Sequence, residues 1–346
     1  MRVLVLGGTG LISTPIVEQL LQSDHDPVII NRGQTPSRLS AEVETVHIDR
    51  NEFEAFETAV EEINADAVID MLTFDSYTAE HAVNTFKDSN VKQYIFCSSA
   101  SVYGPLNQIP ADESETHNAT GLYGQHKSEA EQIFIQALKE HQFPVTILRP
   151  SHVYGPGQCL PSLWGYDACL VSRIRTDKGI IVPGDGFGAF QIAYADDVAA
   201  AFVHALGVPD TLGQVYNIAP EAHLDWRTYI NTIGESVHKE VQLIPVPTNL
   251  LIAGSLTEAT SLLEEIYQYP MSYSSVHFRK HVPAWTVETP LIDGLTNTID
   301  WMSCTNAHIS PDDQPWIDPL IDKVLDFEKD LALSNFAMDE KLFNEE

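Results

Sequence analysis

The chain has 346 residues, and 49 acidic against 19 basic side chains give it a formal net charge of −30 at pH 7. A negative field of this size repels phosphate backbones, which argues against nucleic-acid binding. The four cysteines form no C-x-x-C pair, so we expect free thiols in a reducing cytoplasm and no metal site. No segment reaches the roughly 20 apolar residues that a membrane helix needs, so we expect no membrane partner.

Short apolar runs alternate with helical segments through the first half of the chain. We expect strands at 3–6, 28–30, 46–48, 67–69, 94–97 and 145–148, and helices between them, for example at 12–22, 52–62 and 79–87. This alternation predicts an α/β fold of the Rossmann type, with a doubly wound parallel sheet. Ligands of such sheets bind at the carboxyl ends of the strands.

The pattern becomes irregular after residue 155. Residues 159–167 are rich in Pro, Trp and Gly and predict a loop, whereas 196–206 predict a helix and 215–218 a further strand. We expect residues 1–158 and 189–218 to form a dinucleotide-binding domain, and 159–188 and 219–310 to form a smaller substrate-binding lobe. Residues 311–346 form an acidic tail, which we expect to be helical at first.

A glycine-rich turn, Gly7-Gly8-Thr9-Gly10, separates the first expected strand from the first expected helix. Gly7 permits a tight turn, and Gly10 lets the backbone approach a pyrophosphate, which the N–H groups of the helix start can bind. Ser13 takes the place of the third glycine and is still small enough for close helix–strand packing. This placement predicts a site for a nicotinamide dinucleotide.

The second expected strand ends at Asn31-Arg32-Gly33, without the acidic residue that usually binds the ribose of NAD. Arg32 can meet a 2′-phosphate, stack on the adenine, or be a solvated turn residue. We therefore expect NADP or NAD as cofactor, with NADP favoured. Asp49 is placed to accept a hydrogen bond from the adenine amino group. The expected cofactor-binding residues are Gly7, Thr9, Gly10, Leu11, Ile12, Asn31, Arg32, Asp49, Arg50, Met71, Leu72, Ser98, Tyr123, Lys127, Pro150 and Val153.

Tyr123 and Lys127 stand four residues apart, on one face of an expected helix. A tyrosine is a poor base at its ordinary pKa of about 10, but a neighbouring ammonium group favours the phenolate. The hydroxyl-rich turn from Ser98 to Gly104 follows the fifth expected strand, where a hydroxyl group can bind the same substrate oxygen as Tyr123. Together with the glycine turn, this arrangement predicts that Tyr123 and Lys127 are a catalytic pair.

With these motifs, the chain resembles the extended short-chain dehydrogenases/reductases of the NAD-dependent epimerase/dehydratase family, in an atypical UDP-galactose 4-epimerase-like branch. The resemblance covers residues 1–300 and includes the segments 148–156, 195–199 and 215–218. It implies a homodimer, with Tyr123 as acid/base, Lys127 as its modulator and ribose ligand, and Ser99 as the partner of the substrate oxygen. The expected substrate-binding residues are Ser99, Ser101, Tyr123 and His152.

The turn after Ser99 continues with Ala100-Ser101, where dehydratases of the family place an Asp-Glu pair and decarboxylases a glutamate. We therefore expect an NAD(P)-dependent epimerase of a nucleotide-sugar or related polyol, which removes a hydride and returns it to the other face. An NADP-dependent reductase or dehydrogenase of a ketone or alcohol is the alternative. A second alternative, an RNA-associated or regulatory dinucleotide-binding protein, is opposed by the charge and by the catalytic pair.

Two positions depart from the pattern of the resembled epimerases. His152 stands where they often place an asparagine that contacts substrate, and Phe190 where they often place an arginine on the substrate diphosphate. Arg173, Arg175 and Arg279 could serve a diphosphate or be ordinary surface residues. The sequence therefore leaves the small-molecule substrate open between a nucleotide-sugar and a related polyol.

Overall fold

The computed structural model describes residues 1–222, 224–253 and 262–333. Within this part of the chain, seven parallel strands form one sheet in the order β13-β6-β5-β4-β1-β2-β3. The strands are β1 (Arg2–Leu6), β2 (Asp26–Asn31), β3 (Glu44–His47), β4 (Ala67–Asp70), β5 (Gln93–Cys97), β6 (Val145–Pro150) and β13 (Val215–Ile218). The expected Rossmann-type sheet is therefore confirmed, and every expected strand lies within it.

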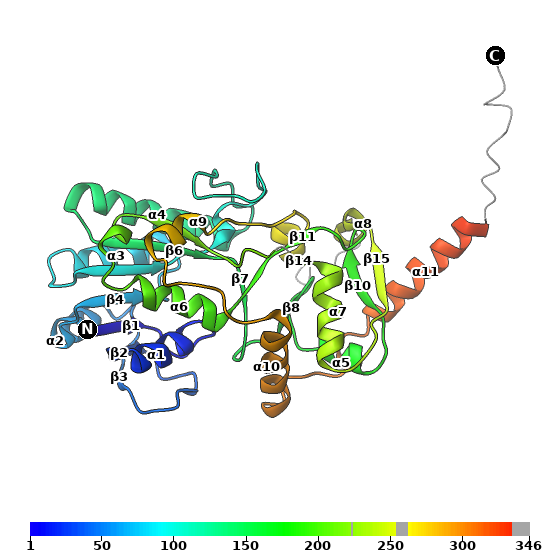
Figure 1. Cartoon of the computed structure of the whole chain (residues 1–346), viewed down its shortest axis with the longest axis horizontal. Coiled ribbons are helices and arrows are strands. Elements are labelled where there is room, and N and C mark those ends of the chain that lie inside the picture. Colours follow the sequence, from blue (N-terminus) through cyan, green and yellow to red (C-terminus); the bar gives the residue numbers. More distant parts are fainter. Residues whose placement is uncertain (223, 254–261, 334–346) are drawn as a thin grey trace, which may run out of the picture.

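Helices cover both faces of this sheet (Figure 1). One face carries α1 (Ser13–Gln22), α6 (Ala195–Ala205) and α9 (Val276–His281), and the other carries α2 (Phe53–Ile63), α3 (Ser76–Phe86) and α4 (Leu122–His141). Val3 and Val5 pack toward α1 and α6, whereas Leu4 and Leu6 pack toward α2, α3 and α4. Successive side chains of a strand point to opposite faces, so a run of apolar residues serves both layers.

The strand order reverses beside β1, whose neighbours are β2 and β4. A crevice forms at such a reversal, outside the carboxyl ends of the strands. Gly7 and Gly8 leave β1 with φ of +120° and +83°. A Cβ atom on Gly8 would lie 2.7 Å from Ile29 Cγ2, so only glycine lets the chain pass over β2 at this point.

A second hydrophobic core lies in a smaller lobe, drawn to the right of the sheet in Figure 1. Its apolar residues come from residue 100 onward and pack largely between α5, α7, β10 and β15. The elements outside the main sheet and its helices are η1 (Ala100–Val102), β7 (His152–Tyr154), β8 (Leu160–Ser162), β9 (Gly165–Asp167), α5 (Leu170–Arg175), β10 (Ile180–Pro183), β11 (Ala189–Phe190), β12 (Ile192–Tyr194), η2 (Pro209–Thr211), β14 (Leu224–Asp225), α7 (Trp226–Ser236), β15 (Leu243–Val246), α8 (Thr248–Ala253), η3 (Leu263–Tyr267), α10 (Leu291–Cys304), η4 (Pro311–Asp313) and α11 (Ile317–Leu333).

Residues 159–167 form a β-hairpin, so the expectation of a loop there was wrong. Leu160 pairs with Asp167, and Ser162 with Gly165, across an antiparallel register. Gly165 has φ of +102°, which a tight connection tolerates in glycine. The Pro, Trp and Gly residues that suggested a loop thus shape a short turn between two buried strands.

The acidic tail begins with a helix, as expected, and this helix packs on the smaller lobe. Trp316 lies edge-on to Trp164, with ring centroids 4.7 Å apart, and Ile317 and Ile321 are buried. Asp318 accepts a 2.6 Å hydrogen bond from Arg173. The rest of the expected tail, residues 334–346, lies outside the described part of the chain.

Candidate active site

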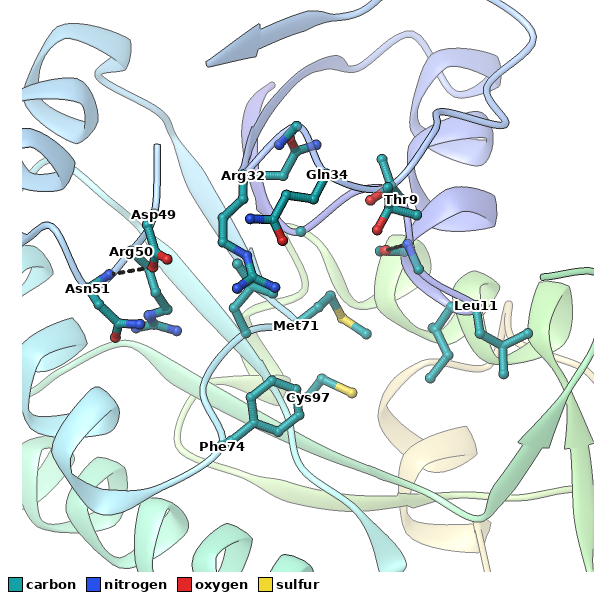
Figure 2. Close-up of a pocket in the computed structure, with 18 of the residues that line it drawn as sticks. Thr9, Leu11, Arg32, Gln34, Asp49, Arg50, Asn51, Met71, Phe74 and Cys97 are labelled. Carbon is teal, nitrogen blue, oxygen red and sulfur yellow. Dashed lines mark hydrogen bonds between the residues drawn. The ribbon is translucent and has the colours of Figure 1, made fainter. Parts of the chain in front are cut away.

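A cavity of about 550 Å³ opens at the carboxyl ends of β1, β2, β4 and β5. We call it the glycine-loop cavity, and Figure 2 shows the side chains that line it. It brings together most of the expected cofactor-binding residues, from segments that are far apart in the sequence. Those residues are Gly7, Thr9, Gly10, Leu11, Ile12, Asn31, Arg32, Asp49, Arg50, Met71, Leu72, Tyr123 and Lys127.

The glycine turn in this cavity has the features that a pyrophosphate needs. A Cβ atom on Gly10 would meet only Ser13 Oγ, at 3.2 Å, so no other side chain shields the backbone. The Gly10 N–H donates to Ser13 Oγ at 2.8 Å, which fixes the loop against the start of α1. The first turn of a helix has N–H groups without helical partners, which favour an anion. The cavity therefore fits a dinucleotide in size and in chemistry.

Arg32 is an exposed cation whose side chain points into the cavity, toward Met71 (Figure 2). Hydrogen bonds of Asn31 hold the turn that carries Arg32. Asn31 Oδ1 accepts the Gly33 N–H at 2.8 Å and lies 3.0 Å from His47 Nδ1. Arg32 makes no hydrogen bond or ion pair with the residues that the structure describes. Its guanidinium is therefore available to an anionic ligand.

Arg50 also lines the cavity, but its guanidinium is directed into the protein. It donates to Thr73 Oγ1 at 2.8 Å and lies 3.4 Å from the buried carboxylate of Asp70. Asp70 accepts the N–H groups of Leu72 and Thr73 at 2.7 and 3.0 Å, which orders the turn after β4. Burial opposes ionisation of Asp70, yet Arg50, the hydroxyl groups of Thr73 and Tyr94 and the Leu72 N–H hold the pKa of its carboxyl below the ordinary value.

Lys127 is buried beneath this turn. Its Nζ donates to the carbonyl oxygens of Thr73 at 2.6 Å and Cys97 at 2.8 Å. The ammonium also lies 4.6 Å from the centroid of the Phe74 ring and 4.9 Å from that of Phe96. Burial lowers the pKa of Lys127, and the Cys97 thiol opposes this effect. Lys127 thus ties α4 to the ends of two strands and places a positive charge beside the cavity.

A second cavity of about 280 Å³ adjoins the first and shares Leu11, Ile12, Cys97 and Tyr123 with it. We call it the serine-turn cavity. All expected substrate-binding residues line it, namely Ser99, Ser101, Tyr123 and His152. Ser98, Pro150 and Val153, which we expected at the cofactor, also line this cavity and not the first.

Tyr123 forms the wall between the two cavities, and 47% of its surface is exposed. The desolvated setting of its hydroxyl raises the pKa of Tyr123 above the ordinary value; the Cys97 thiol adds to this effect and the Ser99 hydroxyl opposes it. The phenol therefore carries its proton at neutral pH and can act as a proton donor. To act as a base, it needs a positive charge nearby, which Lys127 supplies from within the same helix.

The serine turn positions its hydroxyl groups differently. Ser99 Oγ lies 3.0 Å from Ser101 Oγ and accepts the Ser101 N–H at 3.1 Å, so it caps the short helix η1. The Ser98 hydroxyl instead donates to the buried carboxylate of Glu131 on α4. Ser99 and Ser101 are therefore the hydroxyl groups of this turn that a ligand in the cavity can reach.

His152 contributes an uncharged imidazole to the serine-turn cavity. Its Nδ1 lies 2.9 Å from the Tyr267 hydroxyl, and its ring lies against Tyr166 with centroids 5.1 Å apart. Burial lowers the pKa of His152 to about 4. The side chain is therefore neutral at physiological pH and offers hydrogen bonding without charge.

Comparison with known proteins identifies the chain. The model of the NAD dependent epimerase/dehydratase family matches residues 3–219, more than half of the chain. The protein belongs to this family. It is 26% identical over 264 residues to 2'-dehydrokanamycin reductase of Streptomyces kanamyceticus, covering 76% of this chain and 74% of that protein. It is also 26% identical over 336 residues to dTDP-D-glucose 4,6-dehydratase of Mus musculus, covering 87% and 88%.

A solved structure has the same fold as this chain. UDP-glucose-4-epimerase from Stenotrophomonas maltophila, with bound NAD and formylated UDP-arabinopyranose, superposes with a TM-score of 0.74 at 19% identity. The match covers 88% of this chain and 99% of that one. The resemblance to extended short-chain dehydrogenases/reductases and the assignment as an enzyme of this kind are thus confirmed.

Several residues of this epimerase/dehydratase-family site had not been expected from the sequence. In the glycine-loop cavity these include Gln34, Asn51 and Phe74, and in the serine-turn cavity Ile266 and Tyr273. Gln34 and Asn51 directly follow the expected Arg32 turn and Arg50, so proximity in sequence could have indicated them. Phe74, Ile266 and Tyr273 carry no such mark, because folding alone brings them to the site.

Among the residues that the structure describes, no group of three or more His, Cys, Asp or Glu side chains is arranged to hold a metal ion. In the same part of the chain, every helix is too short or too polar to cross a bilayer.

Proposed function

We propose that this protein is an NAD(P)-dependent epimerase that inverts a hydroxyl-bearing carbon of a nucleotide-sugar or related polyol. The observation that carries the proposal is the position of Tyr123, which lines both cavities and shares the serine-turn cavity with Ser99. No carboxylate lines the serine-turn cavity among the described residues, so the acid–base groups of an elimination are missing there. Membership of the family supports the same reading.

The chain's own residues supply the proton chemistry. A bound nicotinamide would supply the hydride acceptor and donor. Ser99 and Tyr123 hold the substrate oxygen, and Tyr123 takes the hydroxyl proton as the carbon loses its hydride. Lys127 stabilises the phenolate that results, and Tyr123 returns the proton when hydride is delivered to the other face of the carbon. Proton and hydride both return to the substrate, so the reaction consumes no cofactor.

Product analysis tests this function. We expect protein loaded with NAD or NADP to convert one member of a panel of nucleotide-sugars and phosphate-free polyols into its epimer, detected by NMR, without net change in nicotinamide absorbance. Stoichiometric consumption of NADPH, with a reduced product and no epimer, would establish the reductase alternative and overturn the proposal.

We also propose that the cofactor is NADP in preference to NAD, because Arg32 presents an unpaired guanidinium in the glycine-loop cavity. A charged hydrogen bond is worth about 1.5–3 kcal/mol, or roughly 10–100-fold in affinity. We therefore expect Arg32→Ala to weaken NADP binding by this factor and to leave NAD binding nearly unchanged, as measured by calorimetry. Arg175→Ala, an exposed arginine outside the cavity, is the matched control. Equal losses for both cofactors would show that Arg32 does not bind a 2′-phosphate.

We further propose a cytoplasmic homodimer whose substrate-binding lobe comprises residues 159–188 and 219–310. The support is the family pattern, the four free cysteines, and the separate core of the smaller lobe. Sedimentation of the full chain tests the homodimer. Solubility of the separated lobe tests the lobe boundaries.

A further inference from the structure

The space beside Tyr123 extends beyond the serine-turn cavity. A third cavity of about 110 Å³ shares Ser101, Tyr123, Leu262 and Ile266 with it. We call it the Glu265 cavity, because Glu265 is the charged side chain among its lining residues. A substrate whose reacting carbon lies at Tyr123 therefore has two neighbouring cavities beside it for its other groups.

Neither cavity offers a cation. No Lys or Arg lines either one in the part of the chain that the structure describes. The segment 254–261, which precedes Leu262 and lies outside that part, contains no Lys, Arg or His in its sequence. His152 is neutral, because burial lowers its pKa to about 4. Among the described residues that line these cavities, the charged side chain that a ligand meets is thus that of Glu265.

The arginines that the sequence left open for a diphosphate line neither of these cavities. Arg173 donates to Asp318 at 2.6 Å, Arg279 pairs with Glu221, and Arg175 is exposed at the end of α5. The remaining arginines lie at the sheet, in the glycine-loop cavity or on the lobe surface, and bind other groups or none. They are Arg2, Arg32, Arg38, Arg50, Arg149 and Arg227.

The packing around Phe190 explains why no arginine stands at this position. Its side chain is fully buried and stacks on Trp226, with ring centroids 4.1 Å apart and planes inclined by 17°. The rings of Tyr229 and Tyr267 meet it edge-on, at 5.2 and 5.6 Å. An arginine here would bury a charge in an aromatic cluster without an acidic partner, at considerable cost.

Glu265 is held at the edge of its cavity by the start of α4. Its backbone carbonyl accepts the Thr120 hydroxyl at 3.0 Å. Its carboxylate lies so close over Gly121 that a Cβ atom there would be 1.9 Å from Oε2. The N-terminus of a helix favours an acidic side chain nearby, so this position suits a glutamate. A diphosphate brought into these cavities would meet this carboxylate and no Lys or Arg from the lining that the structure describes.

We propose that the substrate is a phosphate-free polyol whose charge, where it has one, is positive, and that Glu265 binds an amino substituent of it. This inference rests on the proposed epimerase function and narrows its substrate class. A buried anion without a partner loses its hydration and gains no ion pair, whereas an ammonium gains one from Glu265. The net charge of −30 also draws cations toward the protein and repels anions.

Calorimetric titration of the cofactor-loaded full chain tests the proposal. The probes are UDP-glucose, UDP, and a matched pair of phosphate-free glycosides, methyl glucoside and methyl 2-amino-2-deoxyglucoside. We expect the two UDP ligands to bind more weakly than about 1 mM and the amino glycoside to bind at least about tenfold more tightly than the neutral one. UDP or UDP-glucose binding at micromolar concentrations would overturn the proposal.

Variants of Glu265 test whether its carboxylate binds the amino group, even where the wild-type protein binds every probe weakly. We expect Glu265→Gln to remove the preference for the amino glycoside, and Glu265→Lys to raise the affinity for UDP by about tenfold or more. Glu129→Gln, an exposed carboxylate on α4, makes the same change in charge and should alter neither value. Affinities that are unchanged in both Glu265 variants would contradict the role of this carboxylate.

These results are separable from those of the epimerase test. Epimerisation of UDP-glucose would leave the proposed function intact and overturn the inference on substrate class. Binding of a phosphate-free amino polyol that is then reduced, with no epimer formed, would support the inference on substrate class and overturn the proposed epimerase function.

Discussion

Replacing Tyr123 with phenylalanine is expected to lower turnover by at least about 10²-fold, the usual contribution of a general acid/base group. The change removes one hydroxyl from the wall between the two cavities and keeps the ring, so binding of the dinucleotide should stay nearly unchanged. Lys127 keeps its hydrogen bonds to Thr73 and Cys97, because neither involves Tyr123. The loss should therefore appear in kcat, measured with saturating cofactor, and not in the cofactor's Kd.

The pH dependence of the same variant gives a second readout. Because the pKa of Tyr123 is raised, oxidation by the wild-type enzyme should become faster as the pH rises toward that value, and Tyr123→Phe should lose this dependence. Tyr77→Phe is the matched control, since Tyr77 is an exposed tyrosine at the start of α3, outside both cavities. Turnover of Tyr123→Phe close to the wild-type value would remove Tyr123 from the acid/base role.

Features set by local sequence could be predicted before the structure. The buried strands appear as short apolar runs, and the glycine turn directly follows the first of them. Tyr123 and Lys127 share a helix face because they are four residues apart. The position of Ser99 followed from its place directly after β5.

Contacts between distant segments could not be predicted in this way. Arg38 donates to the carbonyl oxygens of Pro156 and Gly10, so the loop after β2 is tied across the start of α1. The Ser98 hydroxyl, expected at the cofactor, is directed to Glu131, 33 residues further along the chain. Nothing local to Ser98 indicates this partner, because only the packing of α4 against β5 brings the two groups together.

This partner of Ser98 belongs to a buried ion pair that supports the site. Glu131 is fully buried on α4, one turn beyond Lys127, and accepts from Arg149 Nε at 2.8 Å. Arg149 also donates to the Tyr103 hydroxyl at 2.7 Å. Burial acts to lower the pKa of Arg149, but hydrogen bonding and attraction from Glu131 raise it above the ordinary value. The guanidinium is therefore charged and depends on this one carboxylate for its compensation.

We expect Glu131→Gln to lower the free energy of unfolding by about 3–5 kcal/mol, because breaking one side of a buried ion pair leaves an uncompensated charge. Denaturant unfolding measures the loss, and Glu129→Gln on the exposed face of the same helix should stay within about 0.5 kcal/mol of wild type. A loss below about 1 kcal/mol would mean that the Tyr103 hydroxyl and the other neighbours suffice for Arg149.

The double variant Glu131→Gln with Arg149→Met separates the cost of an uncompensated buried charge from the loss of the hydrogen bond between Ser98 and Glu131. Removal of both charges from the core is often neutral in energy, so the double variant should recover much of the stability lost in Glu131→Gln. We expect the turnover of both variants to stay below the wild-type value, because the Ser98 hydroxyl lacks in each the carboxylate that ties the serine turn to α4. Ser99 follows Ser98 directly, and Tyr123 lies two turns before Glu131 on α4. These two outcomes would separate a role of the ion pair in stability from a role of the Ser98–Glu131 hydrogen bond in positioning Ser99 relative to Tyr123.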